Sequence, residues 1–299
     1  MGILDQALAV VDNYRRTLAS DAKDLIHNPR DTLTKLAYNT ADTAMGQIKA
    51  MEQGDVSSLL PGGKAVAGAG AHLLGTFAGQ GAKTFPLAKL SKFVDMEDAG
   101  KSAKDILKET GIFRGSEGKL RYEIPDTGIK LKPAEVQDGI QTYSVEHPDI
   151  VTAYPEAQKI LDTLRVKVDP SVRPNGSFNH RTQEMQVQAP TEDAAKSVVA
   201  HELQHFIQGT EGFARGGNPK MFDPMYKSRF DAIGFQIPEE ELMKAESLDP
   251  YQAYLRIAGE VESRAVETQL TKALKGTPGN PLDSFDIPFD KMIQLPKIE

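Results

Sequence analysis

The sequence predicts an α+β fold, in which a helical N-terminal region precedes a domain that combines a small, mainly antiparallel sheet with several helices. Three observations support this prediction. Apolar residues recur at helical spacing through residues 1 to about 53. Apolar and polar residues alternate in residues 119–132 and again in 178–188, as they do in half-buried strands. Helical spacing then returns in residues 191–208 and 251–274.

The composition is that of a globular protein without thiol chemistry. The 299 residues are 39% hydrophobic and 26% charged, and they include no cysteine. Disulfides, thiolate zinc sites and a cysteine nucleophile are therefore excluded, and any bound zinc must use histidine and carboxylate ligands. The formal net charge of −7 does not favour non-specific binding to nucleic acid, so we expect no nucleic-acid partner.

The N-terminus does not have the pattern of a secretory signal peptide. Asp5, Asp12, Arg15 and Arg16 interrupt its first turns, which leaves no apolar stretch of the required length. Synthesis in the cytoplasm is therefore expected.

A change of composition indicates two modules, residues 1–94 and residues 95–299. The stretch from Ala65 to Ala82 has no charged residue, but its glycines make it only weakly hydrophobic, and its length is at the short limit for a membrane span. We expect residues 1–94 to be a helical assembly region in which this stretch packs within an oligomer or connects helices. Contact of residues 56–94 with a membrane is the alternative.

The second module is expected to begin with a helix, continue with strands and end with helices. Residues 95–110 predict a helix that ends at Gly111, and Thr191 is a suitable N-cap for the helix after the strands. The strands are expected at 119–124, 129–132 (after a turn at 125–128), 164–168, 178–181 and 185–188, the last two forming a hairpin. Further helices are expected at about 237–247 and 250–275.

The helix after Thr191 carries a His-Glu-x-x-His motif. His201 and His205 are four residues apart, so on a helix they share a face and can offer two imidazole nitrogens to one ion. Glu202 lies beside that face, where a general base can take a proton from an attacking water. Val199 and Leu203 lie roughly opposite and would bury against a core. The motif predicts a zinc site; histidines that only form hydrogen bonds, or a zinc that is not catalytic, are the alternatives.

The third zinc ligand is expected on the helix at 251–274. A catalytic zinc takes three protein ligands and leaves one position open. Gly259 and Ser263 are small and four residues apart, which allows this helix to approach the motif helix closely. Glu260 and Glu262 flank that strip of small residues, and helical phase alone does not choose between them.

Other polar residues are candidates for the surroundings of the site. His147 and His180 are rival ligands, although a lone histidine is more often a hydrogen-bonded residue. Candidates for holding the ligands in place are Asn218, Arg264 and Glu267. Candidates for stabilising a developing oxyanion are His180, Arg215, Tyr251 and Tyr254.

Several motifs in order carry a resemblance to a known family. These are residues 109–124, His147-Pro148, Tyr154-Pro155, residues 201–218 and Gly259-Glu-Val-Glu-Ser-Arg264. Over about residues 109–270 the chain resembles the zincin-like metallopeptidase domain of large polyvalent proteins of phages and mobile elements. It also resembles some phage virion proteins.

The resemblance implies a gluzincin-type site. In such sites two helix histidines and a downstream glutamate hold Zn²⁺, and the glutamate of the motif is the base. A small residue often stands three positions after the ligand glutamate. Ser263 has that place relative to Glu260, which favours Glu260 over Glu262. The resemblance also implies that the strand near 184–188 forms a sheet edge that holds an extended peptide.

The predicted function is that of a zinc-dependent peptidase with a protein or peptide substrate. We expect it to be made in the host cytoplasm and incorporated into a phage virion, as a homo-oligomer or bound to other virion proteins. Whether it is also an ejection protein is left open at this point. The alternative is a structural or ejection virion protein in which the zinc domain is a binding module without catalysis.

Overall fold

The computed structural model describes residues 75–137, 140–226, 229–230 and 235–296. The described residues divide into two compact units, one of residues 86–110 and the other of residues 75–85 together with 111–296. The helices predicted in 1–53, and residues 56–74 of the segment predicted to pack or to contact a membrane, lie outside the described residues. Among the helices that are described, none combines the length and the apolar character that a membrane crossing requires.

The smaller unit is a pair of helices, α4 (Leu90–Asp98) and α5 (Ala103–Thr110), after a 3₁₀ turn at Leu87–Lys89. The sequence predicts one helix over 95–110, but Gly100 interrupts it with a φ of +66°, a conformation that glycine adopts without steric cost. Ser102 then starts α5, because its hydroxyl accepts a hydrogen bond from the Asp105 amide at 3.2 Å. The end of α5 just before Gly111 is as predicted.

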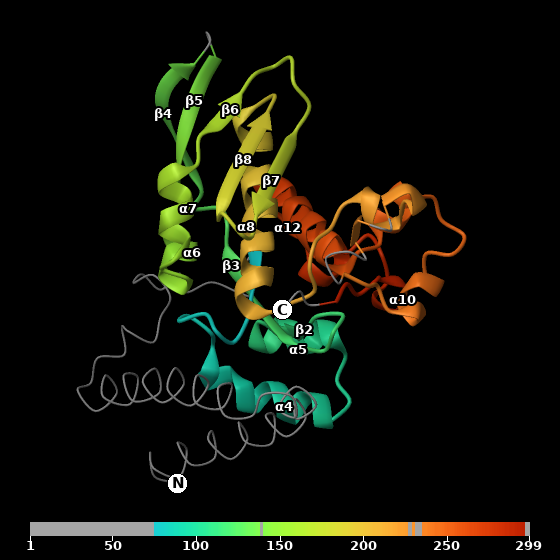
Figure 1. The fold of residues 1–299 in the computed structure, drawn as a ribbon. Coiled ribbons are helices and arrows are strands. Elements are labelled where there is room, and N and C mark those ends of the chain that lie inside the picture. Colours follow the sequence, from blue (N-terminus) through green and yellow to red (C-terminus); the bar gives the residue numbers. More distant parts are fainter. Residues whose placement is uncertain (1–74, 138–139, 227–228, 231–234, 297–299) are drawn as a thin grey trace, which may run out of the picture. The chain divides into compact units, whose positions relative to one another are not determined.

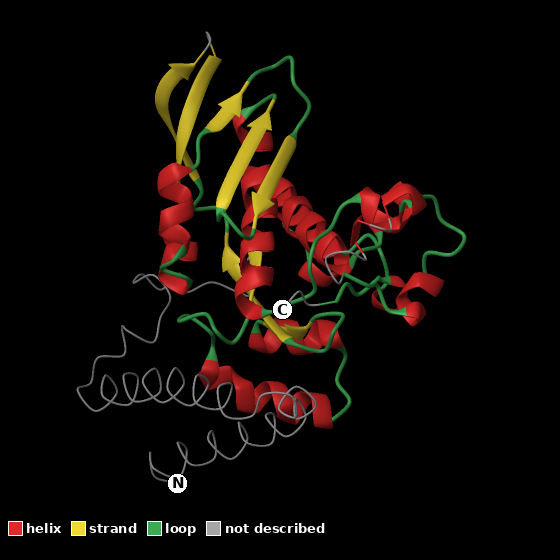
Figure 2. Cartoon of the chain, viewed as in Figure 1, coloured by secondary structure: helices red, strands yellow, loops and turns green. Residues whose placement is uncertain are grey.

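The larger unit contains two sheets, so the fold is mixed α/β with one more sheet than the sequence predicts (Figure 2). The three-stranded sheet has the order β1-β3-β2 and the five-stranded sheet the order β4-β5-β6-β8-β7. All pairs are antiparallel except β6 with β8. The strands are β1 (Gly75–Ala78), β2 (Ile112–Arg114), β3 (Leu120–Pro125), β4 (Lys130–Gln137), β5 (Ile140–Glu146), β6 (Val166–Val168), β7 (Asn175–Asn179) and β8 (Glu184–Ala189).

One feature of this topology was left open by the sequence, and one differs from what the sequence predicts. The strands on either side of the turn at 125–128 do not pair with each other, because β3 and β4 belong to different sheets. β1 pairs with β3, so residues 75–85 belong with the larger unit although they precede the boundary expected at residue 94.

The helices of the larger unit bring the two sheets together. They are α6 (Pro148–Ala153), α7 (Ala157–Thr163), α8 (Glu192–Glu211), α10 (Glu239–Met243), α11 (Pro250–Leu255) and α12 (Ala258–Leu274). The long helix α8 packs on β7 and β8 of one sheet and on β1 of the other, and α12 runs beside it (Figure 1). On β8, Met185, Val187 and Ala189 point into this core, whereas the residues between them are more exposed.

The helix predicted over 250–275 is interrupted where α11 meets α12. Ile257 leaves the helical path there and bridges to Ile293 near the C-terminus. The Ile293 amide also donates to the Arg256 carbonyl at 2.7 Å, and the Ala258 amide donates to the Ile293 carbonyl at 2.9 Å. The C-terminal segment therefore fixes the first residues of α12, the stretch that contains Glu260.

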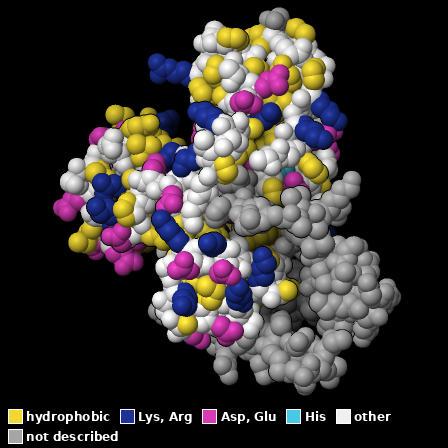
Figure 3. Space-filling model, turned by 180° about the vertical axis from the view of Figure 1, so that it is seen from behind, with side chains coloured by type: hydrophobic (Ala, Val, Ile, Leu, Met, Phe, Trp, Pro, Cys, Tyr) yellow, Lys and Arg dark blue, Asp and Glu magenta, His cyan; other side chains and the backbone are white. Residues whose placement is uncertain are grey.

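The described surface seen in Figure 3 mixes basic, acidic and apolar side chains. This face shows no broad area of one charge. The expectation that nucleic acid is not a partner stays a prediction.

Candidate metal site

The two histidines of the motif lie one helical turn apart on α8, with ring centroids separated by 5.0 Å. The helix begins as predicted, since the Thr191 hydroxyl accepts a hydrogen bond from the Ala194 amide at 3.2 Å. Val199 and Leu203 on the opposite face are fully buried. Burial of that face fixes the rotation of the helix about its axis, so His201 and His205 point away from the core.

Glu260, in the first turn of α12, completes a cluster of three donor residues. Its Oε2 lies 3.9 Å from His201 Nε2, and its Oε1 lies 3.6 Å from His205 Nε2. One donor atom from each residue can be chosen so that all lie within 4.8 Å of one another. Two imidazole nitrogens and one carboxylate are ligands that zinc accepts, and they leave a fourth position for a water or a substrate.

The remaining polar atoms of these residues are occupied, which leaves both Nε2 atoms for a metal. His201 Nδ1 lies 3.3 Å from Glu267 Oε2, and His205 Nδ1 lies 2.9 Å from Gln208 Oε1. Such contacts on the far ring nitrogen orient metal-binding histidines. Burial lowers the pKa of His205, although Glu260 opposes that effect, and the neutral imidazole is the form that binds a metal.

Glu260 is itself held at both carboxylate oxygens. The Tyr254 hydroxyl donates to its Oε2 at 2.8 Å, and the Gly217 amide donates to its Oε1 at 2.8 Å. The chain passes very close at this point. A Cβ on Gly216 would lie 2.6 Å from Glu260 Oε1, and a Cβ on Gly259 would lie 2.2 Å from the Arg215 carbonyl carbon. The lack of a side chain at Gly259 therefore lets the loop after α8 approach α12 closely. The sequence predicted instead that this small residue would let α8 itself approach.

Glu202 lies beside the cluster and is 4% exposed. Burial raises the pKa of Glu202 to about 7; His201 opposes this rise, and Glu260 and Glu267 add to it. A carboxyl group with a pKa near neutrality can both accept and return a proton. Its position is set by β7, because Gly176 leaves just enough room for the carboxylate: a Cβ there would lie 2.5 Å from Glu202 Oε1.

All four residues line one cavity of about 670 Å³. β7, α8, the loop at 216–218, α11 and α12 form its walls, and Phe178, Tyr251 and Tyr254 give it an aromatic component. β7 is the last strand of its sheet, so its outer edge is open to pairing among the described residues. The expectation that the strand at 184–188 forms this edge is wrong. That strand, β8, is paired on both sides, and the strand before it in the chain is the edge.

The other candidate ligands do not belong to the cluster of donor residues. Glu262 accepts from Arg121 at 2.9 Å and does not join the cluster. His147 is fully buried with its Nε2 2.7 Å from Asp126 Oδ1, so it is a structural residue. His180 lines the cavity, but it is not part of the donor cluster. Burial lowers the pKa of His180 to about 4, helped by Arg215 and His205, so its ring is neutral at pH 7.

The other candidates are divided between the site and its margin. Glu267, one of the three candidates for holding the ligands in place, contacts His201. Arg264 lines the cavity but binds Asp286 and the Leu255 carbonyl rather than a ligand. Asn218 caps the 3₁₀ helix at Pro219–Phe222 and also lines the cavity, whereas Arg215 is not among the lining residues.

Sequence reasoning missed four contacts of the three donor residues. One is the Ser263 hydroxyl, whose Oγ lies 3.3 Å from His205 Nδ1, whereas the sequence used Ser263 only as a small residue. Tyr254 was a candidate for the oxyanion, yet its hydroxyl holds Glu260. The Gly217 amide gives no signal in a sequence. Gln208 could have been found, because it stands three residues after His205 on the same helix, the spacing at which side chains meet.

Comparison with known proteins gives one match. Residues 75–132 match a family described as large polyvalent protein associated domain 23. No curated protein and no solved structure matches the chain. The match covers well under half of the chain, and it supports the expected relation to large polyvalent proteins. It ends before α8, so the zincin-like peptidase in that expectation stays a prediction.

Proposed function

We propose that the chain is a zinc-dependent peptidase. The observation that carries the proposal is the convergence of His201, His205 and Glu260 in one cavity with the buried carboxyl group of Glu202. The donor set fits zinc by its chemistry, since both far ring nitrogens are already engaged and both Nε2 atoms face the same carboxylate. No thiolate is present in the chain to compete for the metal.

The roles of the residues follow from their positions. His201, His205 and Glu260 would hold the metal, which when bound supplies Lewis acidity to the scissile carbonyl and acidifies the attacking water. Glu202 takes the proton of that water and returns it to the leaving amine. Its pKa of about 7 suits both steps. His180 lines the same cavity as a neutral ring and is our candidate for donating a hydrogen bond to the oxyanion.

An extended peptide is the substrate class that the cavity favours. The open edge of β7 offers backbone donors and acceptors along one wall, and a peptide can pair with such an edge as an added strand. Gly176 of β7 touches Glu202, so a peptide paired there would pass next to the base. Substrate recognition through the main chain would admit a range of side chains.

Replacing the base tests the proposal. Glu202→Gln should keep one zinc per chain, measured by elemental analysis, and should lower the rate of cleavage of an unstructured protein by about 10²- to 10⁴-fold. Glu192→Gln, the same change in the exposed first turn of α8, is the matched control and should cleave like the wild type. Equal cleavage by Glu202→Gln would refute the mechanism. Zinc binding without cleavage of any peptide in a diverse library would favour the alternative, a binding module.

The wider setting is also a proposal. The match of residues 75–132 to a domain of large polyvalent proteins supports an origin in a phage or mobile element. We propose on this basis that the protein is carried in a virion as an oligomer or with other virion proteins. Mass spectrometry of purified particles tests this, and absence of the protein from the particles would contradict it.

A further inference from the structure

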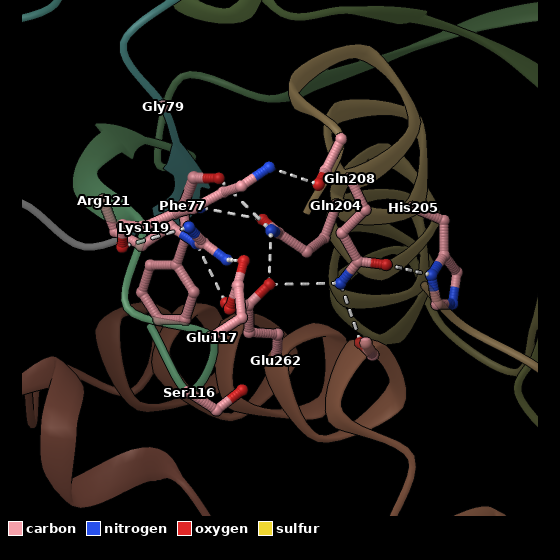
Figure 4. A network of polar contacts seen from close by, with 12 residues as sticks. Phe77, Gly79, Ser116, Glu117, Lys119, Arg121, Gln204, His205, Gln208 and Glu262 are labelled. Atoms are coloured by element: carbon pink, nitrogen blue, oxygen red, sulfur yellow. Dashed lines mark hydrogen bonds and ion pairs between the residues drawn. The ribbon is translucent and has the colours of Figure 1, made fainter. Parts of the chain in front are cut away.

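A buried polar network lies behind the candidate metal site (Figure 4). It begins at His205, whose Nδ1 lies 2.9 Å from Gln208 Oε1. The amide nitrogen of Gln208 then donates to the Gly259 carbonyl at 2.8 Å and to Glu262 Oε2 at 3.3 Å. Glu262 continues the network through its Oε1, which accepts from Arg121 Nε at 2.9 Å. All five residues are buried.

The polarity of these hydrogen bonds admits one arrangement. A backbone carbonyl can only accept, so the Gln208 group that faces Gly259 must be the NH₂ group. The carbonyl oxygen of Gln208 therefore faces His205. That oxygen accepts, so in the neutral ring Nδ1 of His205 carries the hydrogen and Nε2 the lone pair. The Ser263 hydroxyl, whose Oγ lies 3.3 Å from the same Nδ1, then acts as a second, more distant acceptor. The lone pair is thereby on the nitrogen that faces Glu260.

The far end of the network holds Gln208 in this orientation. Glu262 accepts from Arg121, from Gln208 and from Gln204, whose amide nitrogen lies 3.4 Å from Oε2. Gln204 is oriented in turn by Phe77 of β1, because the Phe77 amide donates to its Oε1 at 2.8 Å. Three donors around one carboxylate favour its ionised form, and the guanidinium of Arg121, which Glu117 shares, balances the charge. Burial acts in the opposite direction and raises the pKa of Glu262 to about 7, although Arg121 limits that rise.

We propose that Gln208 is a positioning residue that fixes the tautomer of His205, and that the Arg121–Glu262 pair holds Gln208 in place. Arg121 and Phe77 lie in the segment that matches the polyvalent-protein domain, and Gln208 and Glu262 lie outside it. The matched segment is therefore part of the scaffold of the site. The role of this tautomer in metal binding rests on the proposed function, whereas the assignment of the tautomer rests on the hydrogen bonds alone.

The tautomer is measured first, in the full chain without metal. Histidine labelled with ¹⁵N distinguishes a protonated ring nitrogen from one with a free lone pair, and loss of a signal in His205→Gln assigns it. The proposal expects Nδ1–H in the wild type and a mixture, or Nε2–H, in Gln208→Met. Gln269→Met is the matched control, since Gln269 is another buried glutamine whose side chain has no hydrogen-bond partner among the described residues. It should leave the spectrum of His205 unchanged.

The zinc affinity is measured second, by competition with a chelator. Gln208→Met should weaken binding by about 10- to 100-fold, the usual effect of removing a partner of a metal-binding histidine. The double variant Arg121→Met/Glu262→Met removes both charges of the pair and should weaken binding by a smaller factor, because Gln208 keeps the Gly259 carbonyl. Gln269→Met should bind zinc like the wild type.

The outcomes separate the two proposals. A wild-type His205 that carries its hydrogen on Nε2 overturns the inference without any variant, as does an unchanged tautomer in Gln208→Met. An affinity in the double variant equal to that of the wild type overturns the part assigned to Arg121 and Glu262. A chain with the expected tautomer that binds no zinc would refute the proposed function and leave the assignment of Gln208 standing.

Discussion

Gly176 of β7 provides a sharp test of how the base is placed. An alanine at this position would put its Cβ 2.5 Å from Glu202 Oε1 and 2.7 Å from Val198 Cγ1. Ordinary contacts need about 3.5 Å, so the carboxylate must move by about 1 Å or the strand must shift by a similar amount. Displacement of a catalytic group by this distance can cost about 100-fold in rate. Crowding in the core adds about 1–3 kcal/mol of destabilisation.

The expected result for Gly176→Ala is a kcat reduced by about 100-fold with one zinc still bound per chain. The zinc should remain because the three atoms nearest to the added Cβ belong to Glu202 and Val198 and not to any of the three proposed metal ligands. The assay compares peptide cleavage and metal content at a temperature well below the unfolding transition. Gly279→Ala is the control, because a Cβ at Gly279 meets no atom within 4 Å. A Gly176→Ala variant with the kcat of the wild type would show that β7 does not place the base.

Three further predictions concern stability and metal binding. The raised pKa of Glu202 means that the folded, metal-free chain binds the proton of this group more tightly than the unfolded chain, so its stability falls as the pH rises from about 4.5 to about 7. Glu202→Gln lacks this effect. In urea denaturation it should be more stable than the wild type at pH 8, by up to about 3 kcal/mol, and equal to it near pH 4. Arg121→Met should cost about 3–5 kcal/mol in urea denaturation because it leaves the buried Glu262 and the largely buried Glu117 without their shared cation. The double variant with Glu262→Met should recover only the part of this loss that comes from Glu262. Glu260→Ala should weaken zinc binding by more than about 100-fold, since it removes a ligand rather than a partner of one, and wild-type affinity in a chelator titration would exclude Glu260 as a ligand.

Features that depend on neighbouring residues were accessible from the sequence. Thr191 caps α8 and α5 ends before Gly111 because the groups that decide these ends lie within one turn of them. The hairpin of β7 and β8 follows from its own alternation and turn, and its register pairs Phe178 with Met185. The grouping of the two motif histidines on one face likewise follows from helical spacing alone.

Features that depend on distant residues were not accessible. The alternation in residues 119–124 indicates a strand with one solvent-exposed face, but β3 is the middle strand of its sheet and is buried on both faces. Arg121 is therefore fully buried, which its sequence position does not suggest. Helical phase likewise did not choose between Glu260 and Glu262, and only the family resemblance favoured Glu260. The physical reason that Glu262 stays out of the cluster is its ion pair with Arg121, a residue far away in the sequence.

The order of strands gives a further example. Alternation marks both β7 and β8 as strands, but the sequence does not say which one has a second neighbour. β8 pairs with β6 in parallel, and that pairing joins residues about twenty positions apart, with β7 between them in the chain. The edge strand is therefore Asn175–Asn179, and not the strand expected near 184–188.

The unpaired edge of β7 also affects the tendency of the protein to aggregate. A bare strand is a template onto which any unfolded segment can add, including one from another copy. Asn175, Ser177 and Asn179 project from it into solvent, and such short polar side chains are poor strand formers. Substituting valine or isoleucine there to gain thermal stability would make this edge prone to pairing with other chains, so the more heat-stable variant would be the one that precipitates.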